Sequence, residues 1–325
     1  MSRAGLRPIS RQTRAYFAAV GRANGPTAIF DPSKDGGFQL DAPPSPWIDL
    51  GWIENFHRTT TSQIEGLNAG SAGAVVRQAR HALGARVEFE FRDWGKLQMA
   101  LAGGAEHMNV LASDPSANRA GSGGSALAAV PLLPGSTGNE LLLGAGAVAG
   151  FRTGDLVACD VDYAQQVGYV GSGVAAAYVK NPADVQQDAN YVRRVTFNVG
   201  RVAFTTSGSL VLAQALPGGP PLAGASIQKV TAFVDREGGA FLQQWSGLFV
   251  AEDESGGRVC FYYPILSPCT VRADWVKESL VEIQKPIGQM ALHASFISLA
   301  TVDGNDSAVV LSYRSYFPAS GSAVY

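Results

Sequence analysis

Two aspartates near the middle of the chain have a spacing that could do chemistry. Asp160 and Asp162 flank Val161, so a strand would place both carboxylates on one face. Paired carboxylates can act as general acid and base, and they can also bind Ca²⁺. A solvated strand face gives the same spacing without a site, and we favour that interpretation.

Two glycine-containing runs resemble sites for a cofactor or a nucleophile. Residues 141–150 contain Gly-x-Gly-x-x-Ala after an apolar stretch, as in a dinucleotide-binding turn. Turn residues fill 151–155, where the helix of such a site should run, so we interpret the run as an apolar loop. Residues 69–73 nearly match a serine nucleophile elbow, but they start with alanine and have no strand–turn–helix context.

The histidines, the cysteines and a late acidic turn are weaker signals. The histidines are His57, His81, His107 and His293. None has the spacing of a metal pair, and we expect surface or interface roles for those in strands. The cysteines form no CxxC pair and are expected to be small buried hydrophobes in a reducing compartment. Residues 303–306 resemble part of a calcium loop, but they fit a hairpin turn better. We predict no cofactor and no metal.

Composition limits the classes of function further. The chain has 325 residues, is 46% apolar and carries a net charge of −2. This charge gives no basic footprint for nucleic acid and no polybasic patch for a membrane. The basic N-terminus lacks the apolar core of a signal peptide, and no stretch approaches the roughly 20 apolar residues of a membrane span.

The clearest structural signal is the alternation in residues 85–93. Val87, Phe89 and Phe91 alternate with charged residues, which predicts a strand with one buried and one solvated face. Similar alternating patterns recur as far as the C-terminus. Further strands are expected over residues 192–199, 202–206, 209–215, 228–235, 241–251 and 258–265. The chain is therefore predicted to be all-β and antiparallel, with few short helices.

The first third of the chain is expected to contain an arm, a loop and a hairpin. Residues 1–46 read as an irregular N-terminal arm, and ordered structure is expected from Trp47. The glycine-rich residues 66–73 read as a loop. A strand over 74–82 is then expected to form a hairpin with 85–92 across Gly84.

A short helix is expected directly after this hairpin. Asp93 is a plausible N-cap, and the helix would run to Ala102. Gly103 and Gly104 would end it, because glycine adopts the left-handed conformation of a C-cap at little cost.

The C-terminal strands suggest self-assembly. Residues 287–301 and 307–317 are expected to form a hairpin around 303–306. Within 288–299 one face is apolar, with Met290, Leu292, Ala294 and Phe296, and the other is small and weakly polar. Such a long strand would be an open edge that ordered assembly could cover. The candidate assembly or lumen residues are Gln289, Ala291, His293, Ala294, Ser295 and Ile297.

In the order of its expected strands and helix, and in their residue patterns, the chain resembles bacteriophage tail tube (major tail) proteins. The resemblance covers about residues 47–110 and 225–320. It is carried by residues 47–51, the hairpin ending in 86–92, the helix 93–102, and the strands in 241–265 and 287–317.

The resemblance implies a β-sandwich or barrel-like subunit with a flanking helix. Such subunits form hexameric rings whose inner sheets join into a tube lined by small and polar residues. The implied partners are further copies of the chain, other tail proteins and DNA in passage, with no membrane. The location would be the virion tail, after synthesis in the host bacterial cytoplasm, and the role structural rather than enzymatic.

The same resemblance divides the chain into an arm, 1–46, and a discontinuous β domain, 47–110 plus 225–325. Residues 111–224 would be an inserted β-rich segment that decorates the tube or extends contacts between rings. Two other functions stay open. One is another virion β protein, such as a capsid decoration or fibre subunit. The other is a β-rich hydrolase that uses Asp160 with Asp162, or His293.

Overall fold

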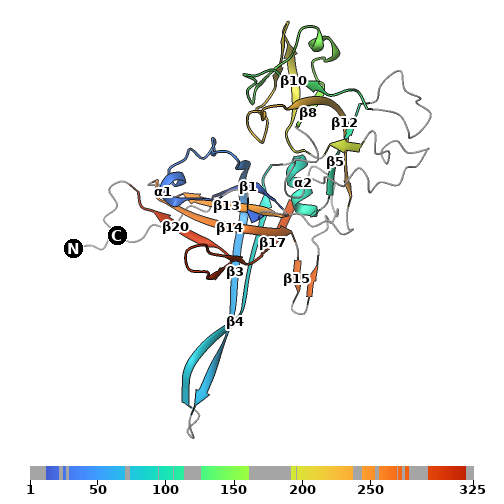
Figure 1. Ribbon diagram of the computed structural model, residues 1–325. Helices are drawn as coiled ribbons and strands as arrows, with labels where there is room; N and C mark the ends of the chain where they lie inside the picture. The colour runs from blue at the N-terminus through green and yellow to red at the C-terminus, as the bar shows by residue number, and fades with distance from the viewer. Residues whose placement is uncertain are drawn as a thin grey trace.

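Antiparallel strands build most of the molecule, as predicted for an all-β chain. The structure is a computed structural model that describes residues 12–21, 25–26, 29–69, 74–93, 95–104, 106–112, 126–160, 192–194, 196–236, 244–252, 256–268, 270–272, 275–277 and 292–319. Figure 1 shows a barrel in the middle, a second sheet on one side of it, and a long hairpin that projects on the other side.

The barrel is one sheet that closes on itself. Its strands are β1 (Thr13–Gly21), β3 (Ile48–Ala69), β4 (Ala74–Phe91), β13 (Trp245–Glu252), β14 (Arg258–Pro268), β17 (Leu292–Ser298) and β20 (Tyr313–Phe317). The order is β13-β1-β3-β4-β17-β14, and β14 pairs back with β13. The short β2 (Gly25–Pro26) pairs with β1, and β20 pairs with β14.

Aromatic rings fill the barrel. Phe17, Phe89, Phe249 and Phe296 come from four different strands and are fully buried. The ring centroids of Phe17 and Phe296 are 5.2 Å apart, and those of Phe89 and Phe249 are 5.4 Å apart. Each such side chain contributes roughly 1.5–3 kcal/mol through burial. The alternation predicted for Val87, Phe89 and Phe91 is therefore confirmed, because all three point into this core.

β1 differs from the predicted N-terminal arm. It lies between β13 and β3, with ladder pairs to both strands. Phe17 faces the barrel interior, whereas Tyr16 and Ala18 face outward and are covered by Phe30 and Trp47. A strand buried on both faces has no polar alternation, so its sequence lacks the signal that identified β4.

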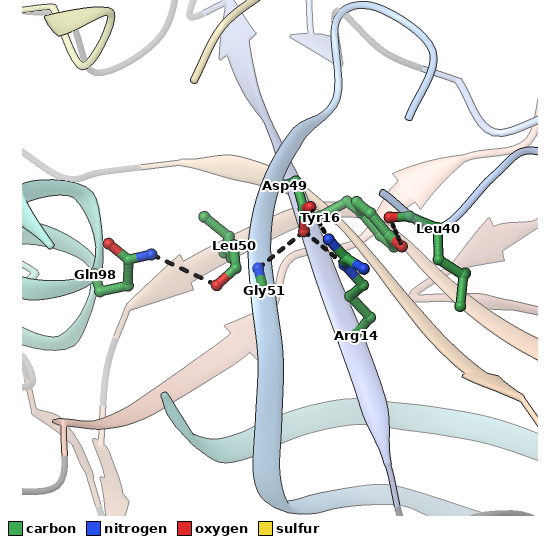
Figure 2. Close-up of polar contacts among 7 residues, drawn as sticks. All are labelled: Arg14, Tyr16, Leu40, Asp49, Leu50, Gly51 and Gln98. Atoms are coloured by element: carbon green, nitrogen blue, oxygen red, sulfur yellow. Dashed lines mark hydrogen bonds and ion pairs between the residues drawn. The ribbon is translucent and has the colours of Figure 1, made fainter. Parts of the chain in front are cut away.

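A polar link attaches the segment after β1 to the barrel, as Figure 2 shows. Arg14 donates through Nε to Asp49 Oδ1 at 3.0 Å, and Gly51 N–H donates to the same oxygen at 2.9 Å. The Tyr16 hydroxyl donates to the carbonyl of Leu40 at 2.7 Å. These bonds hold β1, β3 and the covering segment with its short helix α1 (Pro32–Asp35) in one arrangement.

β3 and β4 form one long hairpin rather than the predicted shorter one. Gly84 lies inside β4, opposite Thr61, and not in a turn. A Cβ at Gly84 would stand 2.9 Å from Thr61 Oγ1, so glycine here permits close approach of the two strands. The prediction of a turn at Gly84 is thus wrong. The predicted loop 66–73 also begins inside β3, which continues to Ala69.

Helix α2 (Lys96–Gly103) closes the end of the barrel nearest the second sheet. Its C-terminus ends as predicted, with Gly104 at φ 60° donating to the carbonyl of Leu101. The predicted N-cap is wrong, because Gly95 occupies that position. Asp93 instead directs its carboxylate toward Gly51, where a Cβ would lie 2.7 Å from Oδ2.

The second sheet has its own apolar core. Its strands are β5 (Glu106–Leu111), β6 (Val130–Pro131), β7 (Glu140–Leu142), β8 (Leu156–Asp160), β9 (Val192–Arg194), β10 (Val199–Thr205), β11 (Ser209–Leu212) and β12 (Ser226–Arg236). Leu141, Val157, Leu210 and Ile227 are fully buried in it. The sheet extends past both ends of the predicted insertion 111–224, because β5 and β12 pair with each other.

Lys96 connects α2 to the second sheet. Its Nζ donates to Asn109 Oδ1 at 2.6 Å and to the carbonyl of Thr196, and it lies 4.8 Å from the ring centroid of Phe233. The His107 ring stacks on Phe197 with centroids 5.0 Å apart. The contact between barrel and second sheet is therefore partly polar and aromatic.

The last strands are not paired as predicted. β17 and β20 both pair along β14, at different residues, and no ladder joins them to each other. The predicted turn at 303–306 is confirmed, but it joins only the two-residue strands β18 (Thr301–Val302) and β19 (Val309–Val310). A further small pair is β15 (Thr270–Arg272) with β16 (Trp275–Lys277).

Candidate assembly surfaces

β17 carries most of the residues predicted for assembly. Leu292, Ala294 and Phe296 are buried in the barrel core, as expected for its apolar face. His293 is exposed on the opposite face, and Ser295 on that face is buried because Arg86 Nε donates to its Oγ at 3.2 Å. Ile297 is half-buried. Gln289 and Ala291 lie outside the described residues.

The expectation that this strand is an open edge is wrong. β17 pairs with β4 over residues 292–297 and with β14 over residues 296–298. Both neighbours are far away in the sequence, so a short-range pattern could not reveal them. The proposed lumen role of this strand remains a prediction.

The outward face of β17 continues across β4 and β3 as one polar surface. His293 pairs with Glu90, Glu90 with Glu54, and Glu88 with His57. We define the polar face as Glu54, His57, Thr59, Arg86, Glu88, Glu90, Arg92, His293 and Ser295. Arg92 Nε lies 2.8 Å from Glu54 Oε1, and Arg86 contacts Glu88. This surface lies on the side of the sheet opposite the aromatic core.

The distal part of the β3–β4 hairpin extends beyond the barrel. We call residues 59–69 of β3 and 74–85 of β4 the ribbon. It projects away from the second sheet (Figure 1) and is roughly 35 Å long at ~3.3 Å per residue. From Thr59 to Gly66 every side chain is exposed.

The outer edges of the ribbon are open. β1 pairs with β3 only as far as Ile53, and β17 pairs with β4 only from Arg86 onward. Among the described residues, β3 and β4 pair only with each other beyond these points. An isolated two-stranded hairpin is marginally stable in water, and open edges invite pairing with another chain.

The two faces of the ribbon differ in chemistry. Thr61 opposite Gly84 and Gln63 opposite Ala82 continue the polar face with uncharged residues. The other face carries Ser62 opposite Leu83 and then Ile64 opposite Arg80. The side chains of Leu83 and Ile64 are 42% and 55% exposed. The ribbon thus presents apolar groups on the side that continues the barrel core.

The candidate catalytic residues are dispersed. Asp160 is buried at the end of β8 in the second sheet, whereas His293 is exposed on the barrel, and Asp162 lies outside the described residues. Residues 147–150 form a 3₁₀ turn after Gly146, which has φ 80°, so no α-helix follows that glycine motif. The described residues contain no group of three or more His, Cys, Asp or Glu side chains placed to hold a metal.

The two described cysteines are buried, as predicted. Burial raises the pKa of the Cys159 and Cys260 thiols to about 12. Cys269 lies outside the described residues.

No protein-family model matches the chain, and no curated protein matches it. None of the helices in the described part of the chain is long and apolar enough to cross a membrane.

Proposed function

We propose that this protein is a structural virion subunit that assembles with copies of itself into the stacked rings of a phage tail tube. The observation that carries the proposal is the ribbon, whose strands form ladders with each other and with no other strand that the structure describes. Pairing with a neighbouring copy would supply the missing backbone hydrogen bonds and cover Leu83 and Ile64. A contact between two different surfaces of identical copies generates rings or filaments.

The polar face supports a role in lining the tube. Apart from two histidines its residues are hydroxylated or charged, with Glu54, Glu88 and Glu90 against Arg86 and Arg92. The surplus of carboxylates would repel DNA phosphates weakly, so a passing genome would slide along the surface rather than bind to it. The proposed lumen therefore includes His293 of β17 together with the charged residues of β4 and β3.

A second candidate is another virion β protein, such as a capsid decoration or fibre subunit. The closure of the barrel through the β13–β14 pairs favours it, because a closed barrel leaves fewer strand edges for building a continuous sheet. The two candidates predict different assemblies.

Negative-stain electron microscopy of the purified full-length protein at high concentration tests the proposal. We expect hollow tubes or six-fold rings. Trimers or isolated fibres would favour the second candidate, and particles that stay monomeric at every concentration would overturn both.

A ribbon variant tests the observation that carries the proposal. Leu83→Asp should leave the circular dichroism spectrum unchanged, because the side chain is 42% exposed, and should abolish the assembly. Leu222→Asp is the matched control, since Leu222 is also exposed but belongs to a loop of the second sheet. Replacing Ala294 by Arg is unsuitable, because Ala294 is fully buried and the charge would unfold the barrel.

A further inference from the structure

A cleft of about 730 Å³ opens on the barrel between the segment after β1 and the β18–β19 hairpin. Its lining is rich in aromatic rings. Tyr262 stacks on Tyr313 with ring centroids 5.9 Å apart, and Phe30 packs against Tyr262. Tyr313 keeps 37% of its surface exposed in spite of this stacking. A concave site with apolar walls and a few fixed polar groups is the usual form of a ligand-binding site.

Two exposed aliphatic side chains extend the apolar surface of the cleft. Ile29, from the segment after β1, is 76% exposed, and Val302, from β18, is 67% exposed. A ligand that packs against these side chains and against Tyr313 would remove apolar area from water, which favours binding.

The turn 303–306 places polar groups beside the exposed ring. The Tyr313 hydroxyl donates to Asp303 Oδ2 at 2.6 Å, and Asn305 N–H donates to Asp303 Oδ1 at 2.9 Å. These bonds lower the pKa of the Asp303 carboxyl, so it is ionised at neutral pH. A carboxylate has about four acceptor positions, and a phenolic oxygen that donates can also accept. The cleft therefore offers fixed hydrogen-bond acceptors next to an aromatic ring.

The charges at the cleft are balanced, so they do not select a charged ligand. Asp31 and Asp303 are its carboxylates. Lys34 Nζ lies 3.3 Å from Asp31, and Arg314 supplies a second cation. A fitting ligand is thus neutral, with an apolar face for the rings and hydroxyl groups that donate to the carboxylates. Sugar rings combine these properties, because their C–H bonds carry a slight positive charge that suits the negative face of an aromatic ring.

The cleft lies on the side of the barrel away from the polar face. Tyr262 packs with Tyr16 and Trp47 on the outward side of β1, β13 and β14. The polar face belongs to the outward side of β3, β4 and β17, and the aromatic core lies between the two sides. A tube lined by the polar face would therefore carry the cleft on its exterior.

We propose that this cleft binds a neutral saccharide, with a sugar ring against Tyr313 and sugar hydroxyls donating to Asp303. Ile29 and Val302 pack against the C–H bonds of the same saccharide. Binding at the cleft does not require assembly, and only its position outside a tube rests on the proposed function. A polysaccharide of a cell surface and a free sugar share this chemistry, and the test separates them.

Affinity chromatography on neutral polysaccharides tests the proposal. The probes are dextran, mannan, agarose and chitin, which present glucose, mannose, galactose and N-acetylglucosamine. We expect the wild-type protein to be retained on at least one of them. Elution by the corresponding monosaccharide would support recognition of a free sugar. Elution by oligosaccharide fragments alone would support recognition of a polysaccharide.

Cleft variants test where the saccharide binds. Tyr313→Ala and Ile29→Asp should each weaken binding about tenfold or more in titration calorimetry with the eluting sugar, because they remove ring stacking and apolar contact. Ile29 is so exposed that its replacement should leave the circular dichroism spectrum unchanged. Two matched controls should bind like the wild-type protein. Tyr316→Ala removes an exposed ring from the opposite face of β20, and Ile64→Asp changes an exposed isoleucine on the ribbon.

The outcomes separate this site from the tube function. Retention on none of the polysaccharides, or equal weakening by the cleft and control variants, would overturn the saccharide site and leave the tube function standing. Binding of choline chloride without binding of any saccharide would also overturn it, because the rings and carboxylates would then form a site for organic cations. Saccharide binding by a protein that never assembles would sustain the site and overturn only the tube function.

Discussion

Arg14 and Asp49, which lie 35 residues apart in the sequence, form a two-point ion pair that joins β1 to β3 (Figure 2). The hydrogen bond to Asp49 is the main cause of the raised pKa of Arg14. The guanidinium also lies 5.4 Å from the ring centroid of Trp52. The pair sits where the ladder between the strands shifts register, between Arg14 and Tyr16. It therefore stabilises the barrel where regular pairing is interrupted.

Asp49→Asn should lower the free energy of unfolding by about 1–3 kcal/mol. The change keeps the size of the side chain and removes the charge of a partly buried, charge-assisted pair. Urea denaturation followed by circular dichroism measures it. Lys34→Ala, which breaks the exposed pair with Asp31, is the control and should cost much less. Equal losses in the two variants would contradict a structural role for the Arg14–Asp49 pair.

Phe89→Ala should destabilise the barrel by about 3–5 kcal/mol, because it leaves a cavity among the rings of Phe17, Phe249 and Phe296. Phe204→Ala offers the comparison. That ring is 53% exposed on β10, and its loss should change stability by less than about 1 kcal/mol. The same urea titration measures the loss of stability in both variants. A small loss for Phe89→Ala would mean that the barrel core is not the main source of stability.

The strands β4 and β1 show which parts of the fold the sequence could reveal. β4 was predictable because Phe89 points inward while Glu88 and Glu90 point outward, so burial leaves a period of two in the sequence. β1 was not predictable in this way, because Tyr16 and Phe17 are both buried and consecutive apolar residues give no period.

The candidate assembly surface was only partly predictable. The faces of β17 follow from alternation, but its two neighbours depend on pairing with residues 86–91 and 266–268, which no local pattern reports. The sequence predicts a loop for part of the ribbon, since exposed strands carry the same small and polar residues that loops carry. Gly84 gave a false turn signal because glycine also serves close contact between strands.

Cys159 and Cys260 should resist thiol-specific reagents in the native protein. Burial raises the pKa of each thiol to about 12, so almost no thiolate is present at pH 8, and solvent does not reach the sulfur. A Cys269→Ser variant isolates the pair. Thiol titration with Ellman's reagent should give almost no reaction until denaturant is added, and then two thiols per chain. Rapid native reaction would show that one of these strands opens readily.

The Tyr313–Asp303 hydrogen bond should make the β18–β19 hairpin sensitive to pH at both extremes. The Tyr313 hydroxyl donates to Asp303 Oδ2 at 2.6 Å, which lowers the pKa of Asp303 and raises that of Tyr313 to about 12. The contribution of Asp303 to stability is present above its ordinary pKa of 3.8 and is lost as pH falls through the lower folded value. That of Tyr313 is present below pH 10 and is lost as pH rises through about 12.

Tyr313→Phe tests this pH dependence, because it removes the hydroxyl and leaves the ring stacked on Tyr262. The melting temperature of the wild-type protein should exceed that of the variant by a constant amount between about pH 5 and pH 10, and the difference should shrink toward either extreme. Tyr316→Phe is the control on the opposite face of β20, and it should melt like the wild-type protein at every pH. A difference between wild type and Tyr313→Phe that persists unchanged at pH 2 would show that the hydroxyl does not act through the Asp303 carboxylate.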